Sequence, residues 1–126
     1  MSNFILDSSA VLAFLNQENG AEYVQRLIPD SKISAVNVAE IIARSIELGH
    51  TNESAYESFA TLGLEIIDFD ERHALKTAEL RASTRHLGLS LGDRSCLAAA
   101  ILNQATAATA DRQWKDLSCC PIELIR

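Results

Sequence analysis

The stretch Asn3–Ser9, NFILDSS, decides the fold expected for this chain. Three apolar residues, Phe4–Leu6, predict a short buried strand, and Ser8 or Ser9 is well placed to cap a helix that follows. Asp7 stands between the two, where a carboxylate serves either as a cap or as a ligand. In an open α/β sheet, ligands collect in the crevice at the carboxyl ends of the strands. The function therefore depends on which other acids reach that edge.

The composition predicts one globular domain over residues 1–126, since 48% of the residues are hydrophobic and the chain is long enough to bury a core without disulfides. The longest apolar run, Cys96–Leu102, is far shorter than the ~20 residues of a membrane helix. No Lys or Arg occurs in the first 25 residues, and Asp7 interrupts the apolar start, which argues against a secretory signal. We therefore expect a cytoplasmic protein with no membrane segment.

The cysteines and the net charge narrow the class of protein. Cys96, Cys119 and Cys120 form no CxxC pair and leave an odd thiol, which is typical of a reducing compartment and predicts packing roles. The formal net charge of −6 disfavours a broad basic surface for nucleic acid. A polyanionic substrate agrees with this charge only if several acids gather in one pocket neutralised by divalent cations, with Arg and Lys at its rim.

Alternating strand and helix patterns predict a three-layer α/β domain with a central, mainly parallel sheet flanked by helices. Helix caps and Gly or Pro residues set the expected boundaries. The predicted strands span 4–6, 32–34, 64–69, 105–110 and 121–125. The predicted helices span 8–15, 21–28, 34–49, 52–62, 71–86 and 94–104, with a short helical turn after Asp111.

Four acids are candidate site residues in this arrangement: Asp7, Glu40, Asp93 and Asp111. Asp7 and Asp111 directly follow buried strands, so they should emerge at the same edge of a parallel sheet. Asp93 stands at or just before a helix N-terminus, and Glu40 lies on a helix face away from the main apolar stripe. Taken singly, a structural cap explains each Asp, and a surface pair with Arg44 explains Glu40.

Together the four carboxylates indicate a metal site. Carboxylates a few ångströms apart repel one another, and they are tolerated where a hard cation such as Mg²⁺ or Mn²⁺ lies between them. Such an ion could activate water and offset charge that builds on a phosphoryl oxygen. No His lies at ligand spacing, which disfavours zinc.

The chain resembles the PIN-domain ribonucleases, and within them the VapC-type toxins of bacterial toxin–antitoxin pairs. The resemblance covers nearly the whole chain and rests on four segments in order: ILDSSAVLAFL, SAVNVAEIIARS, LSLGDRSCLAAA and ATADRQW. These segments carry Asp7, Glu40, Asp93 and Asp111. The resemblance implies a Mg²⁺- or Mn²⁺-dependent endoribonuclease in which the four acids hold one or two ions for phosphodiester hydrolysis.

The same resemblance implies further residues and partners. Ser9 and Thr109 match small hydroxyl positions that could hydrogen-bond the carboxylates or their water ligands. Asp116 is a weaker candidate for an accessory acid, and a solvated turn residue is the favoured interpretation. The implied substrate is a structured cellular RNA such as tRNA or rRNA. The implied protein partners are a cognate antitoxin and a second copy in a homodimer.

Three arginines are candidate phosphate contacts because they lie close in sequence to the later acids: Arg44, Arg94 and Arg112. Surface charges that follow capping Asp residues explain Arg94 and Arg112 equally well. Trp114 is expected to be a packing residue rather than to stack on a base.

Two other functions fit parts of the sequence. A receiver-type phospho-acceptor domain has a similar length and an acidic pocket, but the last predicted strand, 121–125, contains no Lys and only Asp68 or Asp70 could accept phosphate. The second alternative is a non-catalytic binding module on a PIN-like scaffold. The presence of all four acids disfavours that module.

Overall fold

A single five-stranded sheet organises the protein, whose computed structural model describes residues 3–126. The strand order is β3-β2-β1-β4-β5, and every pairing is parallel. The prediction of an α/β domain with a parallel sheet is therefore confirmed. A receiver domain has the order 2-1-3-4-5, so the observed order excludes that alternative. The strands are β1 (Phe4–Leu6), β2 (Ser31–Ser34), β3 (Glu65–Ile67), β4 (Thr106–Thr109) and β5 (Ile122–Leu124).

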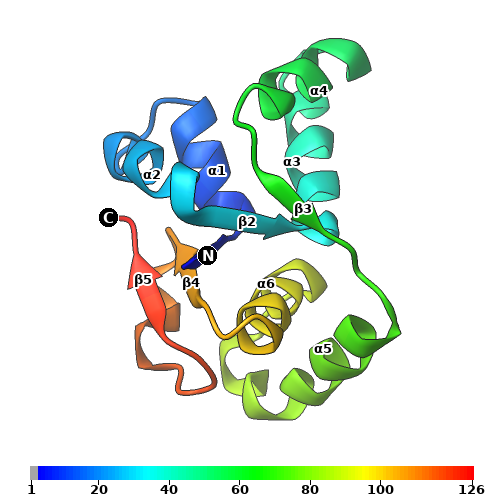
Figure 1. Ribbon diagram of the computed structural model, residues 1–126, viewed down its shortest axis with the longest axis vertical. Helices are drawn as coiled ribbons and strands as arrows, with labels where there is room; N and C mark the ends of the chain where they lie inside the picture. Colours follow the sequence, from blue (N-terminus) through cyan, green and yellow to red (C-terminus); the bar gives the residue numbers. More distant parts are fainter. Residues whose placement is uncertain (1–2) are drawn as a thin grey trace.

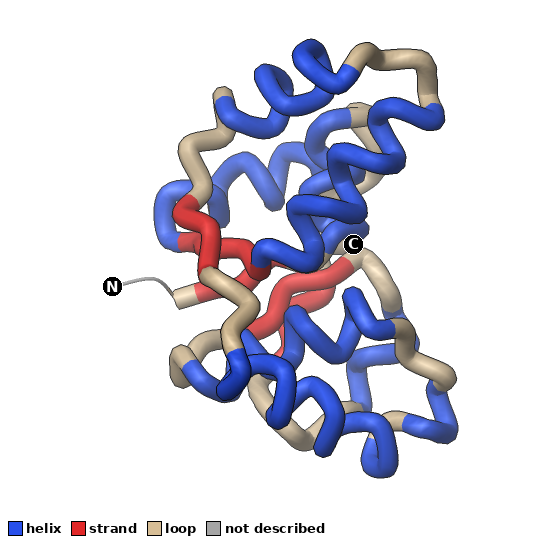
Figure 2. The backbone as a smooth tube through the Cα atoms, turned by 90° about the vertical axis from the view of Figure 1, so that its right-hand side faces the viewer, coloured by secondary structure: helices blue, strands red, loops and turns tan. Residues whose placement is uncertain are grey.

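Helices cover both faces of the sheet and give three layers, as Figures 1 and 2 show. One face carries α1 (Ser8–Leu15), α2 (Ala21–Leu27), α3 (Ala35–Glu47) and α4 (Asn52–Ala60). The other face carries α5 (Glu71–Ser83) and α6 (Leu91–Leu102). Short 3₁₀ segments are η1 (Ile28–Asp30), η2 (Arg85–Leu87) and η3 (Arg112–Asp116). Within residues 3–126, no helix is both long enough and apolar enough to cross a membrane.

The core is divided between the two faces because successive side chains of a strand point to opposite sides. In β1, Ile5 packs with the α6 layer and Leu6 with the α1 layer. In β4, Ala107 and Ala108 divide in the same way. Trp114 is fully buried in the α6 layer, which confirms its packing role and rules out base stacking.

Helix α6 is the most buried helix and reaches the site described below. It packs against β1, β2, β4 and α5. Every residue from Arg94 to Ala100 is buried, and most of these side chains are small, so the helix lies close to the sheet. Cys96 is among them, as its predicted packing role requires, whereas Cys119 and Cys120 are half-buried.

The predicted start of one helix and the predicted capping residue of another were wrong, and both errors concern residues of the candidate site. Helix α6 begins three residues earlier than predicted because Ser90, and not Asp93, is its N-cap. Ser90 Oγ accepts from the Asp93 N–H (3.1 Å), and the Asp93 carboxylate accepts from the Ser90 N–H (3.0 Å), which is a capping box. At α1 the cap is Asp7 rather than a serine.

Candidate active site

The strand order reverses between β1 and β4, which lie side by side at the centre of the sheet. The chain leaves β1 toward β2 on one side and leaves β4 toward β5 on the other. Ligands of open α/β sheets bind beyond the carboxyl ends of the strands at such a reversal. Asp7 follows β1 and donates its N–H to the Ala108 carbonyl of β4 (3.0 Å), and Asp111 lies two residues after β4. Both acids are therefore at the same edge.

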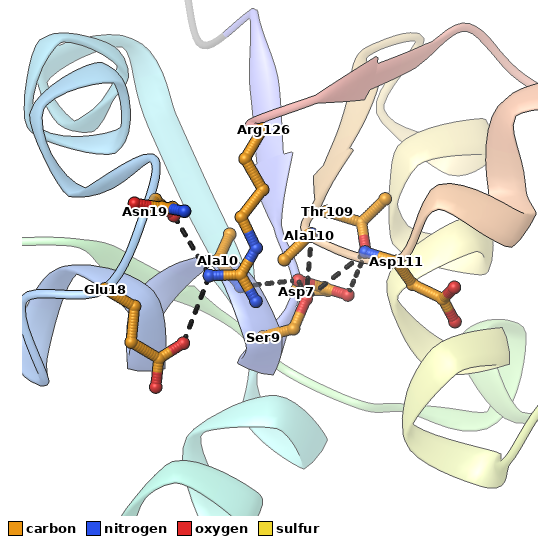
Figure 3. Close-up of polar contacts among 9 residues, drawn as sticks. All are labelled: Asp7, Ser9, Ala10, Glu18, Asn19, Thr109, Ala110, Asp111 and Arg126. Atoms are coloured by element: carbon orange, nitrogen blue, oxygen red, sulfur yellow. Dashed lines mark hydrogen bonds and ion pairs between the residues drawn. The ribbon is translucent and has the colours of Figure 1, made fainter.

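The Asp7 carboxylate is buried and held from three sides (Figure 3). Its Oδ1 accepts from the Ser9 hydroxyl (2.7 Å) and from the Ala10 N–H (2.8 Å). Its Oδ2 accepts from the Thr109 hydroxyl (2.6 Å) at the end of β4. Ser9 Oγ in turn accepts from the Ala110 N–H (2.9 Å). The hydrogen bonds predicted from Ser9 and Thr109 to a carboxylate are thus confirmed.

Burial dominates the ionisation of Asp7. Loss of water around the carboxylate raises its pKa from 3.8 to about 6, although the hydrogen bonds from Thr109, Ser9 and Ala10 act in the opposite direction. The nearby negative charge of Asp93 adds to the rise in pKa. A buried carboxylate in this state gains from a cation placed beside it.

Glu40 projects from α3 toward α1 and α6. Its Oε1 accepts hydrogen bonds from the Ser8 hydroxyl and from the Asn37 side-chain amide (2.9 Å). The same amide also donates to Ser8 Oγ (3.1 Å) and to the Gly92 carbonyl (3.1 Å). Asn37 therefore joins three helices around one oxygen of Glu40.

Gly92, in the first turn of α6, makes room for this acid. A Cβ at this position would overlap the carboxylate of Glu40. The next residue is Asp93, so the absence of a side chain at Gly92 lets acids from α3 and α6 approach each other. No backbone strain is involved, since Gly92 lies within a regular helix.

Asp93 and Asp111 complete the set, and each is anchored by a backbone N–H. Asp93 is the third residue of α6 and takes part in the capping box. Asp111 caps η3 by accepting from the Gln113 N–H (3.0 Å), and its own N–H donates to Thr109 Oγ1 (3.0 Å). Thr109 therefore contacts both strand-end acids.

The charges of the four acids act on one another. Partial burial raises the pKa of Asp93, and the negative charges of Glu40 and Asp111 raise it further. The charge of Asp93 in turn raises the pKa of Asp7. Asp93, at the start of α6, thus responds to the charges of Glu40 and Asp111 and acts on Asp7. Hydrogen bonds connect Glu40 to Ser8, beside Asp7, and Asn37 to Gly92, beside Asp93, while the roles of the four acids as metal ligands stay a prediction.

The chemistry of this set fits a hard divalent cation. Asp93, Glu40 and Asp111 each use one carboxylate oxygen in hydrogen bonds, and the other oxygen has no such partner within residues 3–126. The buried Oδ1 of Asn37 also has no hydrogen-bond partner there. An all-oxygen donor set of this kind suits Mg²⁺ or Mn²⁺. In the positions described, no three His, Cys, Asp or Glu side chains of residues 3–126 lie close enough together to hold a metal ion.

The other predicted site residues lie outside this cluster or serve another purpose. Arg94 is buried and donates to the Thr77 carbonyl (3.0 Å) and the Leu89 carbonyl (3.4 Å), so it joins α5 to α6 and is not free to contact phosphate. Asp116 lines a cavity of about 310 Å³ whose lining includes none of the four carboxylates. Its candidacy as an accessory acid stays a prediction.

Two of the three arginines predicted to contact phosphate, Arg44 and Arg112, lie on the surface of the protein. Arg44 forms an ion pair with Glu47 (3.2 Å), one helical turn further along α3. Arg112, next to Asp111, donates to the main-chain carbonyl of Arg126 (2.9 Å). Arg126 itself contacts Glu18 (3.2 Å), as Figure 3 shows. Both Arg44 and Arg112 stay candidates for contacts at the rim.

Sequence reasoning missed Asn37 and the role of Ser8. The only local sequence feature that pointed to Asn37 was its spacing. It precedes Glu40 by three residues and therefore lies on the same face of the helix. The contacts of Asn37 with α1 and α6 join residues 29 and 55 positions apart in the chain. No local pattern reports contacts of that range.

Comparison with known proteins agrees with this architecture. The PIN domain family model matches residues 4–118. No curated protein gives a match. Among solved structures, the fold is similar to a chain of the DNA-bound VapBC complex from Salmonella typhimurium, with a TM-score of 0.76, 21% identity and full coverage of both chains.

Two further solved structures have the same fold. A toxin–antitoxin complex from Klebsiella pneumoniae matches with a TM-score of 0.79 and 16% identity, covering 98% of each chain. FitAcB from Neisseria gonorrhoeae matches with a TM-score of 0.72 and 21% identity, covering 97% of each chain. With the family match over most of its length, and with this sheet and this strand-end cluster of acids, the chain belongs to the PIN-domain family.

Proposed function

We propose that this chain is a metal-dependent endoribonuclease that acts as the toxin of a VapC-type toxin–antitoxin pair and cleaves a structured cellular RNA such as tRNA or rRNA. The observation that carries the proposal is the placement of Asp7 and Asp111 at the reversal of strand order, with Glu40 hydrogen-bonded to Ser8 beside Asp7, and Asn37 to Gly92 beside Asp93. Membership of the PIN-domain family supports a nuclease.

In this proposal each carboxylate has a defined task. Asp7 is fixed by Ser9 and Thr109, and Glu40, Asp93 and Asp111 each have one oxygen without a hydrogen bond within residues 3–126 that could bind an ion. One or two Mg²⁺ or Mn²⁺ ions held there would activate water and stabilise charge on the phosphodiester. Ion binding requires ionised carboxylates, so the raised pKa values of Asp7 and Asp93 should make the metal affinity increase with pH.

The proposal includes two protein partners. The similar solved structures are toxin–antitoxin complexes, which supports a cognate antitoxin that holds the nuclease inactive. Large apolar side chains of the α3–α4 pair are exposed, namely Ile46, Leu48 and Tyr56, and give a surface for a protein contact. We also propose a homodimer, which sedimentation of the purified protein tests directly.

The test is incubation of the purified chain, freed of any partner, with bacterial total RNA in Mg²⁺ or Mn²⁺ and in EDTA. Discrete fragments that form only with metal support the proposal, and mapping of their ends identifies the substrate. Absence of cleavage together with absence of divalent-metal binding in calorimetry would favour the binding-module alternative.

Gly92→Ala is expected to reduce cleavage while preserving the fold. The new Cβ displaces the carboxylate of Glu40, which is the end of a flexible side chain and so moves in place of the backbone. The helix propensity of Ala exceeds that of Gly by about 1 kcal/mol, and this gain in stability offsets the stability lost when Glu40 is displaced. We expect about a 10- to 100-fold loss of cleavage and of Mg²⁺ affinity, measured by RNA gel assay and by calorimetry.

The matched control places the same change in a Glu40→Ala background. With the carboxylate gone there is nothing to displace, so the added methyl group should cause no further loss of Mg²⁺ affinity. Parental cleavage by Gly92→Ala alone would mean that the position of Glu40 beside Gly92 does not matter to the reaction.

A further inference from the structure

Positive charge is concentrated in one segment of this acidic protein. Residues 71–87, which form α5 and η2, contain four of the eleven Lys and Arg residues and two of the seventeen Asp and Glu residues. The ion pair between Lys76 and Glu79 (3.2 Å) uses one charge of each sign. The segment therefore keeps a net positive charge beside a site that is strongly negative.

Two arginines of this segment share a cavity. The cavity measures about 200 Å³ and is lined by Arg81, Thr84, Arg85, Gly88 and Leu89. The two arginines are exposed, whereas Thr84 and Leu89 are buried and form its walls. A water molecule occupies about 30 Å³ in the liquid, so the volume admits a group of several atoms such as a phosphate.

Neither guanidinium in this cavity has a protein partner. Within residues 3–126, Arg81 and Arg85 make no salt bridge and no side-chain hydrogen bond. Two like charges that line one cavity repel each other, and an anion placed between them removes that cost. A guanidinium also presents paired N–H donors that match two oxygens of a phosphate.

The cavity is built from the same loop that starts α6. Leu89 lies four residues before Asp93, so their Cα atoms are at most about 14 Å apart. Arg94, in the first turn of α6, donates to the Leu89 carbonyl and fixes the loop to the helix. The cavity therefore lies at a fixed distance from the carboxylates. A few nucleotides of a bound RNA strand can span this distance.

From this geometry we propose that Arg81 and Arg85 form a phosphate subsite for the RNA backbone, outside the carboxylate cluster. The inference rests on the proposed function and adds a substrate requirement to it. An RNA must extend past the cleaved bond and around the start of α6 to reach the cavity. Long or folded RNA gains this contact, whereas an oligonucleotide of a few residues does not.

The test compares an Arg81→Gln/Arg85→Gln variant with an Arg26→Gln/Arg72→Gln variant, which removes the same charge from exposed positions outside the cavity. Binding of fluorescein-labelled bulk tRNA and of a labelled five-nucleotide RNA is measured by anisotropy in EDTA over a range of salt. We expect the cavity variant to bind tRNA about tenfold more weakly, with a salt slope lower by about 1 to 2. Its affinity for the five-nucleotide RNA should be unchanged.

The outcomes separate this subsite from the nuclease assignment, because binding in EDTA needs no cleavage. If the cavity variant and the control lose equal tRNA affinity, or if the parent binds no tRNA, the subsite is overturned whether or not the protein cleaves RNA. If 5 mM inorganic phosphate stabilises the parent but not the cavity variant to heat, while both bind tRNA equally, the cavity holds free anions only, and the RNA assignment fails. Selective loss of tRNA binding supports the subsite even for a chain that cleaves nothing.

Discussion

Asp93→Asn is expected to abolish RNA cleavage while leaving the fold intact. Asp93 interacts with the charges of the other three acids, so its carboxylate is central to any ion held between them. Loss of several kcal/mol of metal-assisted stabilisation corresponds to about a thousandfold lower kcat. The amide oxygen of Asn can still accept from the Ser90 N–H, so α6 keeps its start. Single-turnover cleavage in Mg²⁺ and the Tm measure the two effects.

Asp116→Asn is the matched control for this substitution. Asp116 is exposed and is the last residue of η3, the short helix that Asp111 caps. It lines a cavity to which none of the four acids contributes. We expect its rate to stay within about threefold of the parent, as is usual for an exposed charge distant from the reaction. A thousandfold loss with Asp116→Asn, or parental cleavage with Asp93→Asn, would contradict the assignment of the acids.

Asp7→Asn is expected to stabilise the metal-free protein by up to about 3 kcal/mol at pH 7. The pKa of the buried Asp7 carboxyl is raised from 3.8 to about 6, and each pKa unit corresponds to about 1.4 kcal/mol. An Asn amide avoids the cost of burying the charge. Its Nδ2 can donate to Thr109 Oγ1 if that hydroxyl turns toward Ser9 Oγ, 3.3 Å away.

The sign of the pH dependence follows from the raised pKa. Between about pH 4 and pH 6 the folded protein binds more protons at Asp7 than the unfolded chain does, so the stability of the parent falls as the pH rises through this range. The advantage of Asp7→Asn should therefore be full above pH 6 and vanish below pH 4. Urea unfolding in EDTA at several pH values measures it.

Asp68→Asn is the control for this stability effect, because it makes the same chemical change at an exposed carboxylate. Its effect on the free energy of unfolding should be within about 0.5 kcal/mol at every pH. If Asp7→Asn lowers stability at pH 7, the hydrogen bonds from Ser9 and Thr109 outweigh the cost of burying the charge.

Features encoded in local sequence were predicted well. The strand before Asp7, the start of α5 at Glu71 and the burial of Trp114 follow from apolar runs and capping residues. The convergence of Asp7 and Asp111 required one more rule, that parallel strands end at a common edge. Glu40 and Asp93 were singled out from their positions on predicted helices, and the family resemblance implied the same four acids.

Features that depend on distant contacts were not predictable. The strand order, the three-helix contact of Asn37 and the burial of Arg94 all join segments that no local pattern connects. Arg94 shows the physical reason. An arginine after an acid is usually a surface charge, but here two backbone carbonyls satisfy its guanidinium inside the protein.

The hydrogen bond between Thr109 and Asp7 links residues 102 positions apart. Because β1 pairs with β4, the central strand of the sheet has its full set of neighbours only after residue 109 has been synthesised. At about 5 to 20 residues per second, translation delays this contact by about 5 to 20 s after Asp7 is made. The nascent chain consequently carries no assembled site until the residues of β4 have left the ribosome and paired with β1.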